Sequence, residues 1–124
     1  MKSLSLIENK VEFLNGFIQY LNKTDADNWC TDICRDPKGR NCLIGHLVDY
    51  MEFPDHGIKM NNLIDVFEYE IASTYAVFAV NDKRNDNYQQ PTIKERCIAF
   101  MENIMNGKEK TTKEWMDSYT PPID

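Results

Sequence analysis

The sequence predicts an all-α fold: one compact domain of four to five helices, with one short strand near residues 75–80 as an alternative. Three observations support this prediction. Apolar residues recur every three or four positions along most of the chain, which is the period of a helix face buried against a core. Several of these stretches begin at side chains that can cap a helix. Only residues 75–80 are apolar without interruption, and a lone strand would have no partner there, so helix is favoured.

The first predicted helix covers residues 6–22. Ser5 and Glu8 have the spacing of a capping box. Gly16 lies inside the helix, where glycine costs up to about 1 kcal/mol against alanine and allows close packing by a neighbour. The expected buried stripe consists of Ile7, Val11, Leu14, Ile18 and Leu21.

A polar segment, residues 23–40, separates this helix from the next one. Trp29 is its large apolar anchor, and the run 36–39 (DPKG) has the composition of a tight turn. Asn41 can cap a second helix over residues 42–53, which Pro54 ends. Its expected buried residues are Leu43, Leu47, Tyr50 and Met51.

The second half of the chain also contains helical stretches of apolar residues. A third helix is predicted from Met60, Leu63, Ile64, Phe67 and Ile71, with residues 75–80 as its end. After the polar loop 81–90, Thr92 and Glu95 open another capped helix, which Gly107 ends. Its inner residues are Ile93, Cys97, Phe100, Met101 and Ile104. A second capping box spans 111–114, and we expect a single helical domain over 1–119 with a C-terminal tail at 120–124.

Charge and composition exclude several classes of protein. The net charge is −6, and residues 25–86 hold twelve acids against six bases, which accounts for the whole excess. Such a surface repels phosphate backbones, so nucleic acid is not an expected partner. Charged residues interrupt the N-terminal segment, so neither a signal peptide nor a membrane span is expected. Four cysteines in this arrangement do not resemble a disulfide framework, which indicates a reduced, cytoplasmic protein.

A metal site is the first candidate for function. Cys30, Cys34, Cys42 and His46 place four zinc-type ligands within seventeen residues, and Cys42 and His46 are one helical turn apart. The simpler interpretation is that the cysteines are small core residues, because the tight CxxC hairpins of zinc ribbons are missing. No cofactor is therefore expected, with zinc as the alternative.

The second candidate is a thiol site. Cys42 would lie in the first turn of a helix, where the dipole lowers a thiol pKa, and His46 could act as a base with Asp49 as its only local carboxylate. The sequence offers no oxyanion hole for such a pair, and a buried structural cysteine is favoured. We therefore expect no catalytic residues and no enzymatic activity.

The third candidate is a surface for a partner protein. Its acidic part contains Asp65 and Glu68, and its loop part contains Asn81, Asp82, Lys83 and Arg84. Loops that follow rigid elements often carry function. The alternative is that the acids form an ordinary solvated face and that Asn81 and Asp82 cap the preceding helix and turn the chain.

Several short motifs occur in a familiar order: Trp29, then the run 39–45 (GRNCLIG), then the run 80–82 (VND), then the helix that opens near residue 92. Over about residues 29–104 the chain resembles a family of small uncharacterised bacterial and phage proteins with a W…G-R-x-C-x-x-G motif and a later N-D element. The resemblance implies a small helical domain in which Cys42 lies near the Asn81–Asp82 pair. The chain departs from the pattern at His46 and Val80. Cys30 and Cys34 fall outside it, which weakens the zinc hypothesis.

The leading hypothesis is a small acidic protein-interaction module that binds another protein with a basic patch. The resemblance to phage proteins implies a mobile-element protein that binds and inhibits a host protein. The alternative is a metal- or thiol-site protein centred on Cys42 and His46.

Overall fold

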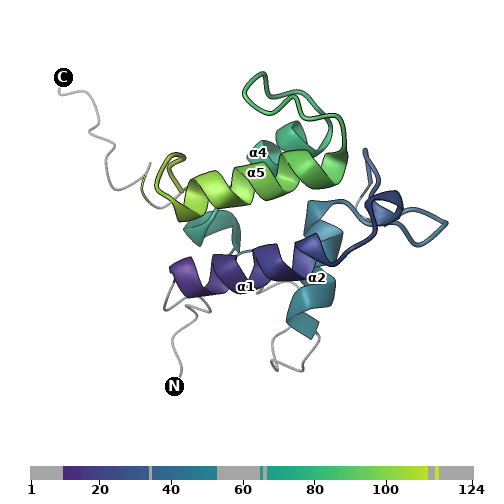
Figure 1. The fold of residues 1–124 in the computed structure, drawn as a ribbon, viewed down its shortest axis with the longest axis horizontal. Coiled ribbons are helices and arrows are strands. Elements are labelled where there is room, and N and C mark those ends of the chain that lie inside the picture. Colours follow the sequence, from purple (N-terminus) through teal and green to yellow (C-terminus); the bar gives the residue numbers. More distant parts are fainter. Residues whose placement is uncertain (1–9, 34, 53–64, 66, 112–113, 115–124) are drawn as a thin grey trace.

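A computed structural model describes residues 10–33, 35–52, 65, 67–111 and 114 of the chain. Within these residues the protein is helical and has no strand, only two isolated β-bridges. Figure 1 shows the helices, whose bounds are α1 Lys10–Asn22, η1 Ala26–Asn28, α2 Leu43–Glu52, α4 Thr74–Asn81 and α5 Ile93–Met105. The predicted all-α fold is confirmed.

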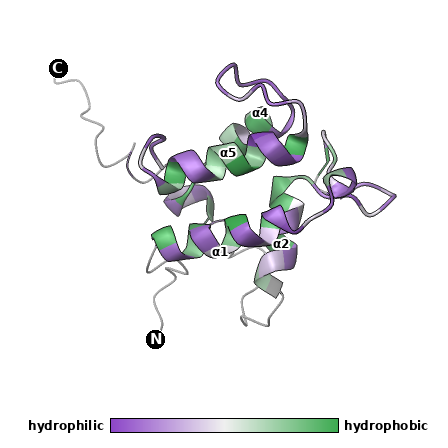
Figure 2. Cartoon of the chain, in the orientation of Figure 1, coloured by the Kyte–Doolittle hydropathy of each residue, from purple (hydrophilic) through white to green (hydrophobic). Residues whose placement is uncertain are grey.

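Among the described helices, α1 and α5 share the most extensive contact, and they run antiparallel (Figure 1). Lys94 joins the start of α5 to the end of α1, because its ammonium donates to the backbone carbonyls of Asn22 at 3.0 Å and Thr24 at 2.6 Å. These carbonyls would otherwise lack partners at the end of the helix. Helix α4 packs on α5, and α2 contacts both α1 and α4. Figure 2 shows hydrophobic and hydrophilic residues alternating along α1 and α5, as expected for helices with one buried face.

Most of the described residues of the predicted stripes are buried, although Tyr50 and Ile93 are only half-buried and Ile7 lies outside the described residues. Val11 is 54% exposed, so its predicted burial was wrong, whereas Phe17 is buried. The buried stripe of α1 is centred between Leu14 and Leu21, which places Val11 at its edge. The core is formed largely by Leu14, Phe17, Ile18 and Leu21 of α1, Leu43 and Leu47 of α2, and Cys97, Phe100, Met101 and Ile104 of α5.

Gly16 allows a neighbour to pack closely, as the sequence predicted, and that neighbour is α2. A Cβ atom at this position would lie 2.6 Å from the hydroxyl oxygen of Tyr50 on α2. The Tyr50 ring packs against Phe13, Phe17 and Tyr20, at centroid distances of 6.2, 5.4 and 5.2 Å. An aromatic cluster therefore holds the two helices together.

Residues 75–80 lie in a separate helix, neither a strand nor a continuation of the preceding one. Residues 67–70 are helical, and the chain leaves the helix at 71–73. Ser73 then caps α4, because its hydroxyl oxygen accepts a hydrogen bond from the N–H of Ala76 at 3.1 Å. The remainder of the predicted third helix, with Met60, Leu63 and Ile64, lies outside the described residues.

The predicted capping signals of the C-terminal part are confirmed. Thr92 accepts from the N–H of Glu95 at 3.1 Å, and α5 ends before Gly107, whose φ is +75°. Thr111 and Glu114 form a reciprocal capping box with two hydrogen bonds of 3.1 Å. None of the described helices combines the length and the apolar character needed to cross a membrane.

Candidate functional site

Asn81 is the centre of a buried polar junction, where the start of α2, the end of α4 and the first turns of α5 meet. Its side-chain oxygen accepts from the N–H of Leu43 at 3.0 Å, and its amide nitrogen donates to the carbonyl of Cys30 at 2.9 Å. The Cys97 thiol lies 3.6 Å from the same oxygen. Asn81 is fully buried, so one side chain joins three distant segments inside the molecule.

Asn81 also replaces Asn41 as the side chain that caps α2. The sequence predicted Asn41 for this role, whereas the N–H of Leu43 donates to Asn81. The Asn41 side chain instead accepts from Arg35 at 2.8 Å and donates to Asp49 at 2.8 Å. Arg35 and Asp49 complete the triangle with an ion pair of 2.5 Å. Sequence proximity favoured Asn41, but the cap comes from a residue 38 positions away.

Arg96 completes the polar junction from the side of α5. The guanidinium is buried and donates to the carbonyls of Val80 at 3.1 Å, Asn81 at 2.8 Å and Gln90 at 2.9 Å. It thereby satisfies carbonyls at the C-terminal end of α4 and anchors the far end of the loop 81–90. Arg96 was not among the residues predicted from the sequence. A signal was present, because Arg96 lies among the apolar positions of the buried stripe of α5.

Asp82 ends α4 and connects it to the loop that contains Asp32. The Asp82 carboxylate, whose side chain is 6% exposed, accepts from the backbone N–H of Asp32 at 3.3 Å. Arg84 is 68% exposed and lies 3.7 Å from both Asp32 and Asp82. Asp82 thus turns the chain after α4. This is the structural alternative that the sequence offered to a binding role.

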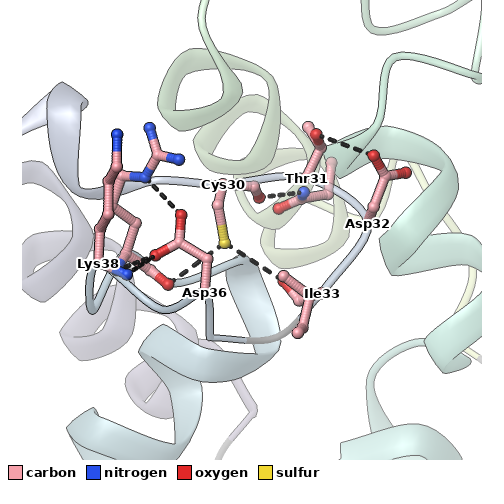
Figure 3. A network of polar contacts seen from close by, with 8 residues as sticks. Cys30, Thr31, Asp32, Ile33, Asp36 and Lys38 are labelled. Atoms are coloured by element: carbon pink, nitrogen blue, oxygen red, sulfur yellow. Dashed lines mark hydrogen bonds and ion pairs between the residues drawn. The ribbon is translucent and has the colours of Figure 1, made fainter.

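The described thiols are core groups. Cys30, Cys42 and Cys97 are all buried. The Cys30 sulfur lies 3.3 Å from the carbonyl oxygens of both Ile33 and Arg40 (Figure 3). Burial raises the pKa of the Cys97 thiol far above its ordinary value. A thiol that remains protonated and enclosed is a poor nucleophile.

His46 is also buried, and its ring centroid lies 4.2 Å from that of Trp29. Burial lowers its pKa to about 4, although Asp49 and a hydrogen bond with the backbone of Asn28 both raise it. The imidazole is therefore neutral at pH 7. Its Nε2 atom is buried and has no hydrogen-bond partner in the described part of the chain.

The described residues contain no group of three His, Cys, Asp or Glu side chains that could hold a metal ion. Cys30 instead contacts backbone carbonyls, and His46 packs on Trp29. Cys34, the fourth ligand of the predicted set, lies outside the described residues. The complete four-ligand site therefore stays a hypothesis from the sequence.

A cavity of about 440 Å³ lies beside the loop 36–40, and Trp29, Cys30 and Ile93 are among the residues that line it. Asp36 shapes the loop, because its carboxylate accepts from the N–H groups of Lys38 at 3.0 Å and Arg40 at 2.9 Å (Figure 3). It also pairs with the Arg40 side chain at 2.5 Å. These interactions satisfy the Asp36 carboxylate, so its role is to hold the conformation of the loop.

The outer side of α4 has a different character, with apolar groups on the surface. Tyr75 is 85% exposed, while Phe78 and Ala79 are half-buried and Phe78 also packs against the core. These three positions, spaced by three and four residues, share one face of the helix, which we call the α4 face. Tyr69, in the preceding helical turn, is also exposed.

Charged side chains flank α4 in the sequence. Before it, Asp65 is exposed and Glu68 is half-buried, with its carboxylate 3.4 Å from the hydroxyl of Thr74. After it, Lys83 and Arg84 are exposed. Of the partner residues predicted from the sequence, Asn81 and Asp82 point into the fold, and the other four lie at or near the surface. Their role in binding stays a prediction.

The sequence resemblance implied that Cys42 lies near the Asn81–Asp82 pair, and the structure places Asn81 on the N–H of Leu43, the neighbour of Cys42. In comparisons with protein-family models, with curated proteins and with solved structures, the chain matched none of them. Function therefore has to be inferred from the arrangement of the residues themselves.

Proposed function

We propose that the protein is an interaction module that binds a partner protein through the α4 face and the charged residues at the two ends of α4. The observation that carries this proposal is the exposure of Tyr75, an aromatic residue that is 85% accessible on a largely apolar helix. Its neighbours Phe78 and Ala79 extend the apolar surface. The burial of the described thiols and of His46 supports a non-enzymatic role.

The energetics of an exposed tyrosine favour binding. Full burial of a large apolar side chain contributes about 1.5–3 kcal/mol. Tyrosine is also one of the residues that most often dominate the binding energy of protein interfaces, because it loses few rotamers and offers a hydroxyl at its edge. Tyr75 therefore provides an anchor whose contact area is available without rearrangement of the fold.

Acidic side chains before α4 indicate the charge of the partner. The carboxylate of Glu68 lies beside the first residue of α4, and Asp65, three residues earlier in the chain, is exposed. These groups attract a basic patch and steer its approach, an effect that salt screens within about 10 Å at 0.1 M. Binding should therefore weaken as the salt concentration rises.

The alternative, a thiol or metal site centred on Cys42 and His46, has less support. Cys42 has no exposed surface, and His46 is buried against Trp29. A substrate would have to open the core to reach either group. Since Tyr75 needs no such opening, the α4 face is the stronger candidate.

Affinity capture with immobilised protein tests the proposal. The bait is incubated with a lysate of cells that express the same chain, and captured proteins are identified by mass spectrometry. We expect Tyr75→Ser, and the double change Asp65→Lys with Glu68→Lys, to reduce capture at least tenfold. Val11→Ser is the matched control, because Val11 is another exposed apolar residue on a different helix. Capture that survives these changes but is lost with Cys42→Ala or His46→Ala would overturn the proposal.

A further inference from the structure

Charges of opposite sign lie near the two ends of α4. Glu68 lies at the N-terminal end, where its carboxylate approaches Thr74, and Lys83 lies two residues beyond the C-terminal end. Arg84 is near Asp32 and Asp82, whereas Lys83 is exposed and forms no ion pair with the described residues. Between these two residues, α4 itself is about 12 Å long.

This arrangement is complementary to itself. When two copies of a helix lie antiparallel across a two-fold axis, the N-terminal end of each meets the C-terminal end of the other. Glu68 of each copy would then lie near Lys83 of the other, so both contacts are attractive. A parallel pairing would bring like charges together at both ends. The charges therefore favour one geometry.

The apolar residues fit the same antiparallel geometry. With the axis near the middle of α4, the Tyr75 ring of one copy lies over Ala79 of the other, so that a large side chain faces a small one. Phe78 then lies close to the axis, where it meets its own counterpart. Such alternation of large and small residues lets two helices approach closely.

We propose that the partner of the α4 face is a second copy of this chain, bound as an antiparallel, two-fold symmetric α4–α4 dimer. This inference rests on the proposed function and identifies its partner, because Lys83 supplies a basic group on the chain itself. One short helix per copy buries less than the roughly 800 Å² per partner of a standard interface, so the dimer is weak and concentration-dependent.

Sedimentation velocity on the full chain tests the dimer, at concentrations from about 10 μM to 1 mM, the range expected for a small interface. We expect the weight-average sedimentation coefficient of the wild-type protein to rise with concentration. The rise should disappear with Tyr75→Ser and persist with Val11→Ser. A wild-type protein that stays monomeric throughout would overturn the inference.

Charge exchange tests the antiparallel geometry. Glu68→Lys and Lys83→Glu, each alone, place like charges in both contacts and should abolish self-association. An equimolar mixture of the two variants should form a heterodimer, because each contact then joins a lysine to a glutamate. Asp65→Lys replaces Glu68→Lys if circular dichroism shows that the latter disturbs the start of α4. A mixture that stays monomeric would overturn the antiparallel pairing.

Failure of the dimer and failure of the proposed function give different results. If the wild-type protein is monomeric but captures a foreign basic protein in a Tyr75-dependent manner, the self-association is overturned and the interaction module stands. If neither sedimentation nor capture depends on Tyr75, both proposals are overturned.

Discussion

The two ends of α4 differ in how the protein uses polar and apolar side chains. At the C-terminal end, the polar Asn81 is fully buried and Arg96 is nearly so, and both are satisfied by internal hydrogen bonds. At the N-terminal end, the aromatic Tyr75 is exposed, and the polar contacts beside it are the cap of Ser73 on Ala76 and the contact of Thr74 with Glu68. Within the eight residues of α4, the C-terminal end buries polar side chains and the N-terminal end exposes an aromatic one.

This difference shows that residue type alone does not separate structure from function. Asn81 and Asp82 have the polar character expected of a binding loop, yet their side chains hold segments of the fold together. Tyr75 has the character of a core residue, yet it contributes nothing to the described core. Burial, rather than polarity, identifies which end of α4 is available to a partner.

Loss of Arg96 should have the largest effect on stability. Arg96→Met keeps most of the side-chain volume but leaves the carbonyls of Asn81 and Gln90 without their donor, whereas the carbonyl of Val80 still accepts from the N–H of Lys83 at 3.2 Å. Each buried polar group left unpaired costs about 1–3 kcal/mol, so we expect a loss of about 4 kcal/mol in the free energy of unfolding. Urea titration followed by circular dichroism measures this loss. Arg84→Met is the control, because Arg84 is exposed, and it should change stability by less than about 0.5 kcal/mol. Equal effects of the two variants would contradict the role of Arg96.

Acid should destabilise the protein through His46, in the buried region. Its pKa in the fold is about 4, below the ordinary value of 6.5, so the unfolded chain binds a proton more readily than the folded one. The stabilisation is complete above about pH 6.5 and is lost as the pH falls towards 4, with a total of about 3 kcal/mol. Urea titrations at several pH values measure this dependence. The difference between wild-type and His46→Gln isolates the imidazole, because other titrating groups are common to both. A constant difference from pH 7 to pH 4 would contradict this assignment.

Asn81→Ala should also weaken the buried end of α4. The change removes the acceptor for the N–H of Leu43 and the donor to the carbonyl of Cys30. We expect a loss of about 2–3 kcal/mol, measurable by thermal or urea unfolding. Asn85→Ala, in the same loop but less buried, is a suitable control. An Asn81 variant as stable as the wild-type would show that the junction does not depend on this side chain.

Tyr75→Ser should have the smallest effect on stability and thereby sharpen the contrast. Tyr75 is 85% exposed, and serine has a similar helix propensity, so the free energy of unfolding should change by less than about 0.5 kcal/mol. Differential scanning calorimetry at low protein concentration measures the effect without contributions from self-association. A loss above about 1 kcal/mol would mean that Tyr75 belongs to the core.

The sequence predicted those elements of the fold that depend on local signals. The capping boxes at Thr92 and Thr111, the end of α5 before Gly107 and the buried stripe of α5 all follow from residues within two turns of one another. Short-range hydrogen bonds and helical periodicity determine these features, so they can be read from one segment at a time.

The polar junction could not be predicted in this way, because its contacts join distant segments. The cap of α2 comes from Asn81 and the carbonyls at the end of α4 are bonded by Arg96, so each role depends on how three helices pack. The sequence included Asn81 among the candidate partner residues, but its burial follows only from tertiary structure. Tyr75 was treated as part of a buried run for the same reason.

The hydrogen bonds of Asn81 also have a consequence for folding kinetics. They join residues 38 and 51 positions apart, and closing such long loops costs chain entropy before any bond is gained. Local helices should therefore form in the folding transition state, and the bonds of Asn81 should form after it. Interactions that form late slow unfolding without speeding folding. We therefore expect the hydrogen bonds of Asn81 mainly to lower the unfolding rate and so to prolong the lifetime of the native state.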